Sequence, residues 1–183
     1  MFISIQELEL RKIDFSEEIR PGVIDFGPDL VQTNALKTSG RAELLAEHRG
    51  GKEVVEDIRI VGRFTVSIEV PCARCLDPVP GNFSGDFDLL YRPLGIDSGK
   101  DEASICEAET EIGYYTGDGL ALEDVLKEQV LLALPVKAIC RESCKGFCPH
   151  CGKNLNAEQC SCAGDTSDPR WSALADIRSK LKN

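Results

Sequence analysis

Cysteines are the residues of this sequence whose number and spacing point most directly to chemistry. Eight of the nine cysteines among the 183 residues form four close pairs, and the ninth, Cys106, has no nearby partner. The first to fourth pairs are Cys72 and Cys75, Cys140 and Cys144, Cys148 and Cys151, and Cys160 and Cys162. Structural zinc sites hold four ligands in a closed tetrahedron, whereas a catalytic zinc keeps an open position. The pairs therefore predict two structural Zn²⁺ ions with four cysteines each.

The four pairs can share two ions in more than one way. The third and fourth pairs fall within residues 148–162, which predicts one local site. The second pair then joins the first pair far upstream, and a metal that closes so long a loop stabilises the fold more than a local one. The other arrangement joins the second pair to the third and the first to the fourth. Spacing alone leaves both arrangements open.

A redox dithiol is a weaker interpretation of the first pair. Redox CxxC motifs usually begin a helix, whose N-terminus lowers the pKa of the thiol. Here Pro78 and Pro80 follow almost directly in CARCLDPVP, so a helix cannot start cleanly at this point.

Five basic residues near the cysteines are candidates for contact with RNA or with a protein partner. They are Arg74, Arg141, Lys145, Lys153 and Arg170. Each tetrathiolate zinc carries a charge of −2, so balancing that charge is the simpler role for these cations. The whole chain has a net charge of −10, but residues 136–183 hold more basic than acidic side chains. RNA contact would therefore be local, through a basic tail on an acidic body.

Acidic residues are the basis of a second hypothesis, in which the protein is an enzyme. A metal-dependent nuclease would need a divalent-ion site, and its candidate ligands are Asp86, Asp88, Glu107, Glu109 and Glu111. Asp86 and Asp88 alternate with apolar residues in a strand pattern, which places them on the solvent face. The sequence therefore predicts no catalytic residue, no enzyme activity and no small-molecule substrate.

Alternating polar and apolar residues predict the sheet that must position these sites. Residues 59–70 alternate most clearly, residues 35–47 and 82–92 follow the same pattern, and shorter strands are expected at 13–19 and 111–115. HRGGKE at 48–53 predicts a turn, and the acidic stretch 94–110 predicts an exposed loop. One polar face and short connections indicate an antiparallel sheet.

Helical spacing of apolar residues predicts one amphipathic helix after Gly119 that ends before Pro135, and a terminal helix from Asp168. The expected fold class is α+β: a twisted antiparallel sheet packed by one amphipathic helix, with a small zinc-binding C-terminal extension. Residues 1–139 form the expected body, including the PCARCL knuckle. Residues 140–183 form a cysteine-rich knuckle and the terminal helix, which is expected to dock on the body.

The sequence also indicates a compartment. No apolar run approaches the roughly 18 residues that cross a bilayer, and MFISIQELELRK lacks the features of a secretory signal. We therefore expect a cytoplasmic protein with no membrane partner. Thiols stay reduced in that compartment, which favours metal ligation over disulfides.

The order of these motifs resembles the YceD family of bacterial proteins. The resemblance covers about residues 60–180 and rests on PCARCL, an acidic linker, a helix ending in LLALP, the string CRESCKGFCPHCGKNLN with CSC, and DPRW followed by a leucine. It implies a role in the synthesis, processing or stability of large-subunit (23S) ribosomal RNA, and so in ribosome biogenesis. It supplies no catalytic residues. Expected partners are a ribosomal protein, a large-subunit precursor or 23S rRNA, and direct RNA binding is the alternative to docking on protein.

Overall fold

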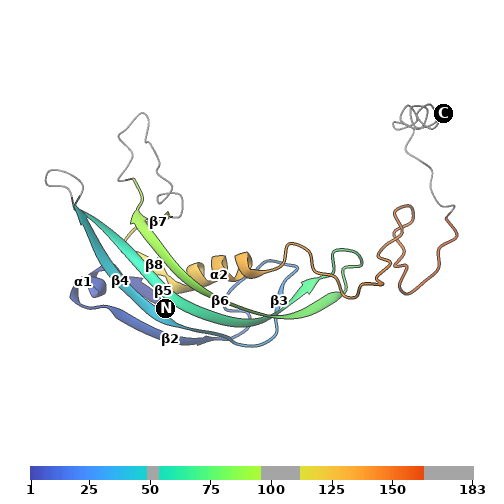
Figure 1. The fold of residues 1–183 in the computed structure, drawn as a ribbon, viewed down its shortest axis with the longest axis horizontal. Coiled ribbons are helices and arrows are strands. Elements are labelled where there is room, and N and C mark those ends of the chain that lie inside the picture. Colours follow the sequence, from blue (N-terminus) through green and yellow to red (C-terminus); the bar gives the residue numbers. More distant parts are fainter. Residues whose placement is uncertain (49–53, 96–111, 163–183) are drawn as a thin grey trace, which may run out of the picture. The chain divides into compact units, whose positions relative to one another are not determined.

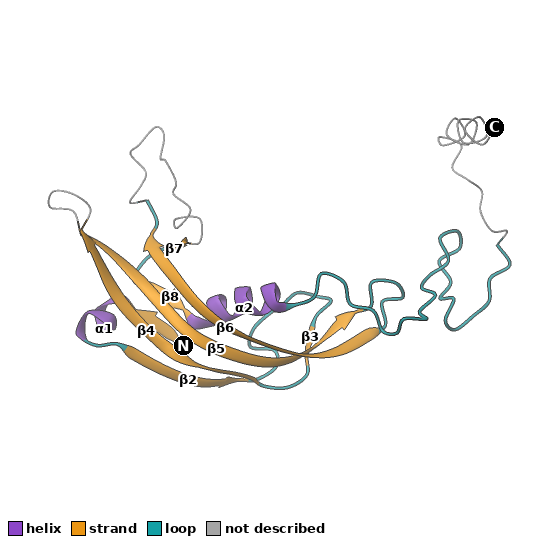
Figure 2. Ribbon diagram, in the orientation of Figure 1, coloured by secondary structure: helices purple, strands orange, loops and turns teal. Residues whose placement is uncertain are grey.

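The computed structural model describes residues 1–48, 54–95 and 112–162, and the chain divides into two compact units, Met1–Cys140 and Arg141–Asn183. Figure 1 follows the chain through them, and Figure 2 shows that strands dominate. The elements are β1 (Phe2–Ser4), α1 (Ile5–Leu10), β2 (Ile13–Ile19), β3 (Val31–Gln32), β4 (Leu36–His48), β5 (Val54–Pro71), β6 (Pro78–Pro93), β7 (Ile112–Tyr115), β8 (Gly119–Ala121) and α2 (Leu122–Ala133). This is an α+β fold, and all of these strands and helices belong to the first unit.

The main sheet has the strand order β2-β4-β5-β6-β7, and β3 pairs with β5 as well. Its five long or medium strands cover the five predicted segments, so those predictions are confirmed. The expectation of a wholly antiparallel sheet is wrong at one place, because β6 and β7 run parallel. Parallel neighbours need a long connection, and residues 94–111 supply one. The short elements β1, α1, β3 and β8 were not predicted, and β1 and β8 form a separate two-stranded sheet.

Some predictions fall outside the described residues. They are the turn after His48, the loop from residue 96 onward with Cys106, Glu107, Glu109 and Glu111, and the terminal helix from Asp168 with Arg170.

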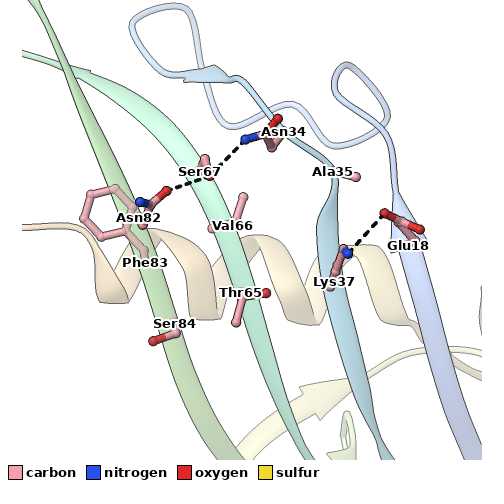
Figure 3. A pocket seen from close by; sticks show the side chains of 10 residues that line it. All are labelled: Glu18, Asn34, Ala35, Lys37, Thr65, Val66, Ser67, Asn82, Phe83 and Ser84. Atoms are coloured by element: carbon pink, nitrogen blue, oxygen red, sulfur yellow. Dashed lines mark hydrogen bonds and ion pairs between the residues drawn. The ribbon is translucent and has the colours of Figure 1, made fainter.

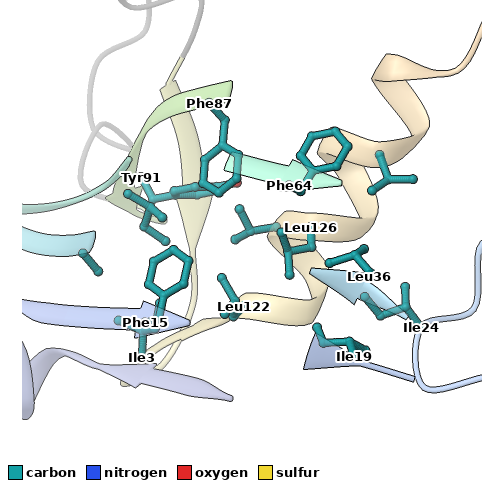
Figure 4. Close-up of a cluster of buried hydrophobic side chains, with 14 of the residues drawn as sticks. Ile3, Phe15, Ile19, Ile24, Leu36, Phe64, Phe87, Tyr91, Leu122 and Leu126 are labelled. Carbon is teal, nitrogen blue, oxygen red and sulfur yellow. The ribbon is translucent and has the colours of Figure 1, made fainter. Parts of the chain in front are cut away.

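The core lies between one face of the main sheet and α2. Strand β5 alternates as predicted: Ile58, Ile60 and Phe64 are buried in the core, whereas Val61 and Arg63 are exposed on the other face. Helix α2 packs on β5 and β6 and buries Leu122 and Leu126 among the sheet side chains (Figure 4). The predicted amphipathic helix is therefore confirmed. It starts directly after β8 and ends before Pro135.

One row across the core face places two phenylalanine rings over two glycines. Phe15 of β2 pairs with Gly40 of β4, Gly40 pairs with Gly62 of β5, and Gly62 pairs with Phe87 of β6. A Cβ at Gly40 would lie 2.6 Å from Cζ of Phe15, and a Cβ at Gly62 would lie 2.7 Å from Cζ of Phe87. Because Gly40 and Gly62 on the inner strands have no side chain, the rings of Phe15 and Phe87 on the neighbouring strands can occupy that space.

Replacement of Gly40 by alanine should destabilise the fold by about 1–3 kcal/mol, the usual cost of overpacking a core. The new Cβ would also stand 2.3 Å from the Val61 carbonyl oxygen, which is backbone and cannot turn away. Urea unfolding of the full chain measures the change. Ser39→Ala is the control on the opposite face of the same strand and should change the free energy of unfolding by less than about 0.5 kcal/mol. Equal stability of the two variants would contradict this account.

A buried ion pair lies where β5, β6 and β7 meet. The Arg92 guanidinium donates from Nε to Oδ1 of Asp57 at 3.1 Å and from Nη2 to Oδ2 at 2.9 Å. Only 3% of Asp57 and 4% of Arg92 are exposed. In the sequence Asp57 lies just before the predicted strand 59–70 and Arg92 at the end of the predicted strand 82–92, so nothing marked them as a pair.

Candidate metal centres

The first pair of cysteines forms the turn between the two longest strands. Strands β5 and β6 remain paired up to Pro71 and Pro78, and the chain between them folds back on itself. The Cys72 amide donates to the Asp77 carbonyl at 2.9 Å, and the Leu76 amide donates to the Cys72 carbonyl at 2.9 Å. Leu76 adopts a φ of 60°, a left-handed conformation that closes the turn. Both sulfur atoms are thereby held at one end of the sheet.

Cys140 reaches the same turn from the segment after α2. The Ala73 amide donates to the Ala138 carbonyl at 2.8 Å, and the Cys140 amide donates to Sγ of Cys72 at 3.4 Å. Sγ of Cys140 lies 3.7 Å from Sγ of Cys75. The four ligand atoms of Cys72, Cys75, Cys140 and Cys144 all lie within 4.8 Å of one another. The structure therefore brings the first and second pairs together.

The third and fourth pairs form a second cluster within Arg141–Asn183. Phe147 and Asn154 pair as a short bridge around the turn CPHCGK, and the Cys148 amide donates to the Lys153 carbonyl at 2.8 Å. Gly152 has a φ of 70°, which the tight turn after Cys151 requires and which glycine adopts without strain. The sulfur atoms of Cys148, Cys151, Cys160 and Cys162 again lie within 4.8 Å of one another. Of the two arrangements left open by spacing, the structure has the one with a local second site.

The spacing of the sulfur atoms fits one tetrahedral ion in each cluster. Sulfur ligands about 2.3 Å from a zinc ion stand about 3.8 Å apart at the corners of a tetrahedron. The Cys75–Cys140 and Cys148–Cys160 sulfur atoms lie 3.7 Å and 3.6 Å apart. Disulfide-bonded sulfur atoms would be about 2.05 Å apart, and none of the eight described cysteines is in a disulfide bond. The geometry of both clusters is therefore that of a metal site.

Backbone amides prepare one thiolate in each cluster. Amides of Arg74 and Cys140 donate to the sulfur of Cys72 and lower the pKa of Cys72 to about 6. Amides of Cys151 and His150 lower the pKa of Cys148 to about 6 in the same way. A metal ligand must be a thiolate, so these hydrogen bonds favour the form that binds.

Neighbouring sulfur atoms have the opposite effect on the last cysteine. A hydrogen bond with Cys151, together with burial and the negative charge of the nearby thiolates, raises the pKa of Cys162 to about 12. Four thiolates at this distance repel one another unless a cation lies between them. A divalent ion would remove that repulsion, so the chemistry of the donor set fits a metal as well as the geometry does.

Asn156 is a supporting residue that sequence reasoning missed. Its Nδ2 donates to Sγ of Cys144 at 3.3 Å, and its Oδ1 accepts from the Lys145 amide at 2.9 Å. Its own amide donates to Oδ1 of Asn154 at 3.0 Å. Such hydrogen bonds orient a metal ligand and tune its charge. The only signal in the sequence is the string NLN directly after the CPHCGK turn, and two asparagines at that spacing do not by themselves indicate a bond to sulfur.

The predicted basic contact residues lie around the clusters. Arg74, Arg141, Lys145 and Lys153 are all exposed, and Lys153 forms an ion pair with Glu158 at 3.4 Å. Their exposure leaves them accessible to a partner. It agrees equally well with a role in balancing thiolate charge.

The acidic residues of the nuclease hypothesis that the structure describes are Asp86 and Asp88. Both project from the exposed face of β6. Asp88 accepts two hydrogen bonds from Arg59, at 2.8 Å and 2.6 Å, so its carboxylate already has a cationic partner. That engagement disfavours a divalent-ion site at this position.

The exposed sheet face carries polar side chains that satisfy one another. Figure 3 shows Asn34 donating to Ser67 at 3.5 Å and Ser67 donating to Asn82 at 2.7 Å. In the same view Lys37 lies 3.7 Å from Glu18. This face therefore combines paired charges with short polar groups.

The described helices also bear on membrane contact. None of them has the length and apolar character that a bilayer-spanning helix needs.

The protein has an α+β fold and two four-cysteine clusters that could each hold a metal ion. The chain belongs to the family described as large ribosomal RNA subunit accumulation protein YceD, whose sequence profile matches residues 60–178. The matched part runs from the middle of β5 through both cysteine clusters. The resemblance stated from the sequence is thus confirmed.

Individual relatives agree with this assignment. An uncharacterised protein of Mycobacterium tuberculosis is 32% identical over 126 residues, which cover 69% of this chain and 58% of the relative. The chloroplastic large ribosomal RNA subunit accumulation protein YCED homolog 1 of Arabidopsis thaliana is 33% identical over 146 residues, covering 68% of this chain and 46% of the relative. The chain therefore spans about half the length of the relatives it matches. No solved structure matches the chain.

Proposed function

We propose that this protein is a non-enzymatic, cytoplasmic factor that supports the synthesis, processing or stability of large-subunit (23S) ribosomal RNA. The observation that carries the proposal is the family match over residues 60–178, together with the name of the Arabidopsis relative. The two cysteine clusters favour a scaffold over a catalyst, because four thiolates leave an ion no open coordination position.

We further propose that both clusters bind Zn²⁺. Four cysteine sulfurs at tetrahedral spacing are the usual ligand set of structural zinc, and soft thiolate ligands exclude Mg²⁺ and Ca²⁺. Cys72, Cys75, Cys140 and Cys144 would hold one ion, and Cys148, Cys151, Cys160 and Cys162 the other. The first of these ions would fix the segment after α2 to the turn between β5 and β6.

Removal of the gene should lower the ratio of 23S to 16S ribosomal RNA. This follows because the proposal places the protein on the large-subunit branch, and 16S RNA serves as the internal control. RNA electrophoresis and sequencing of precursor ends measure the ratio and locate any processing defect. The intact gene should restore the ratio when it is returned to the deletion strain. The level of 16S RNA should stay unchanged throughout. An unchanged ratio would overturn the proposed function.

The mode of action that we favour is docking on a ribosomal protein or a large-subunit precursor, since the chain carries a net charge of −10 and basic proteins are suitable partners. A tagged full chain should then recover a defined ribosomal protein even after nuclease treatment.

Direct RNA contact is the second candidate, and the exposure of Arg74, Arg141, Lys145 and Lys153 supports it. It predicts an affinity for 23S fragments that falls steeply with salt, because bound cations release counterions from the phosphates. Recovery of the partner only while RNA is intact would favour this second mode.

A further inference from the structure

A pocket of about 400 Å³ lies beside the N-terminal half of α2, and none of its lining residues belongs to either cysteine cluster. Strands β7 and β8, the first turns of α2, and Phe2 of β1 line it. Its volume is within the range of sites that enclose a small ligand or a single long side chain. Five of its lining residues carry the chemistry: Phe2, Tyr91, Tyr114, Asp124 and Glu128.

Two carboxylates line this pocket. Asp124 and Glu128 stand one helical turn apart on α2, where two like charges repel. Among the residues that the structure describes, no lysine, arginine or histidine lines the pocket and neither carboxylate has an ion pair. The nearby N-terminal ammonium of Met1 is engaged by Glu123 instead. The helix dipole favours Asp124 in the first turn, but it does not account for Glu128 in the second.

Tyr91 adds an independent sign that a ligand belongs here. It is 8% exposed, and its ring lies against Gly113 of β7, where a Cβ would stand 2.5 Å from Cε1. Its hydroxyl has no hydrogen-bond partner in the described ranges 1–48, 54–95 and 112–162, and Tyr91 lines the pocket. The neighbouring Tyr115, by contrast, donates to the Glu56 carbonyl at 2.9 Å. Burial and the Glu128 charge raise the pKa of Tyr91 to about 12, so the phenol remains neutral and can accept a hydrogen bond.

Aromatic rings form the mouth of the pocket. Tyr114 and Phe2 are 53% and 55% exposed, so both rings are accessible to a ligand beside the two carboxylates. Exposed ring faces attract cations, and a planar guanidinium stacks on them better than an ammonium does. A guanidinium also carries five donors, enough for two carboxylates and a phenol oxygen at once.

We propose that this pocket receives an arginine side chain of a basic protein partner, with the guanidinium between Asp124, Glu128 and the Tyr91 hydroxyl and stacked on Tyr114. The identification of this basic partner as a ribosomal protein rests on the proposed function. The preference for a guanidinium rests only on the pocket and stands if the proposed function fails. Lysine fits less well, because its compact ammonium cannot engage three acceptors and a ring face in one plane.

The test uses three synthetic peptides that differ at one residue, which is arginine, lysine or citrulline, in an otherwise uncharged sequence. Citrulline keeps the shape of arginine and removes the charge. NMR titration of the isotope-labelled full chain should give affinities in the order arginine, lysine, citrulline. The shifted amides should cluster at Tyr114, Gly119 and Glu128.

Glu128→Gln should weaken binding of the arginine peptide about tenfold or more, the effect of losing a charge-assisted hydrogen bond. Asp29→Asn removes the same charge from an exposed site elsewhere and should leave the affinity unchanged. Tyr91→Phe removes only the hydroxyl and should weaken binding while thermal unfolding stays close to wild type. Equal binding of the arginine and citrulline peptides, or equal effects of Glu128→Gln and Asp29→Asn, would overturn the proposal. The RNA ratio in the gene deletion is a separate readout, so failure of either proposal is recognisable by itself.

Discussion

Cys72→Ser should lower the zinc content of the purified chain from about two ions to about one and should also destabilise the first unit. Cys72 and Cys140 are 68 residues apart in sequence, so the metal between them would close a long loop. If a metal restricts the unfolded chain as a disulfide does, closing a loop of this length stabilises the fold by about 4 kcal/mol. Elemental analysis and thermal unfolding followed by circular dichroism measure the two effects.

Cys160→Ser is the matched control for this prediction. It too should remove one zinc ion, but Cys148 and Cys160 are only 12 residues apart and lie outside the unit that contains the sheet. The unfolding temperature of the sheet should therefore stay close to that of the wild type. Cys106→Ser, at a cysteine outside both predicted sites, should retain both ions. A wild-type content near one zinc, or an equal loss of sheet stability in both variants, would contradict the two-site proposal.

Asp57→Asn should cost about 3–5 kcal/mol of folding free energy, because it removes the carboxylate that pairs with the buried Arg92 guanidinium. Breaking a buried ion pair at one partner costs more than the pair contributes to stability, because the two charges were desolvated together. Replacement of both residues, as in Asp57→Leu with Arg92→Met, should recover much of the loss. Urea unfolding at neutral pH provides the comparison.

An exposed pair of the same geometry is the control. Arg59 and Asp88 also form two hydrogen bonds, but their side chains are 41% and 54% exposed. Exposed pairs contribute about 0–1 kcal/mol, so Asp88→Asn should have little effect. If the two single variants were equally stable, burial would not be the source of the predicted difference.

The strands were predictable from sequence because each has one face in water and one in the core. Strand β5 alternates from Ile58 to Ile68, and its core face was assigned correctly at Ile60, Phe64 and Ile68. The parallel pairing of β7 was not predictable, since a four-residue strand after a long connection carries no signal of its direction. Strands β1 and β8 have three residues each, too few to show a period.

The candidate sites, like the strands, were only partly predictable from the sequence. The ligand types of the clusters were evident from the cysteine pairs, but their grouping was not, because it depends on the amide of Cys140 reaching the turn at Cys72. The arginine pocket left no pattern in the sequence at all. Tyr91 and Glu128 come from elements that are distant along the chain, and only the fold places both on one pocket.

The turn that holds Cys72 and Cys75 also bears on the register of the sheet. It closes the hairpin of β5 and β6, whose strands are 18 and 16 residues long, and a slip of one residue in that hairpin would exchange its core and solvent faces. A metal bound at the turn by all four cysteines of the first cluster would hold Pro71 opposite Pro78. We therefore expect metal supply to act on the fidelity of strand alignment, so that chains made under zinc limitation would accumulate as misregistered, aggregation-prone species.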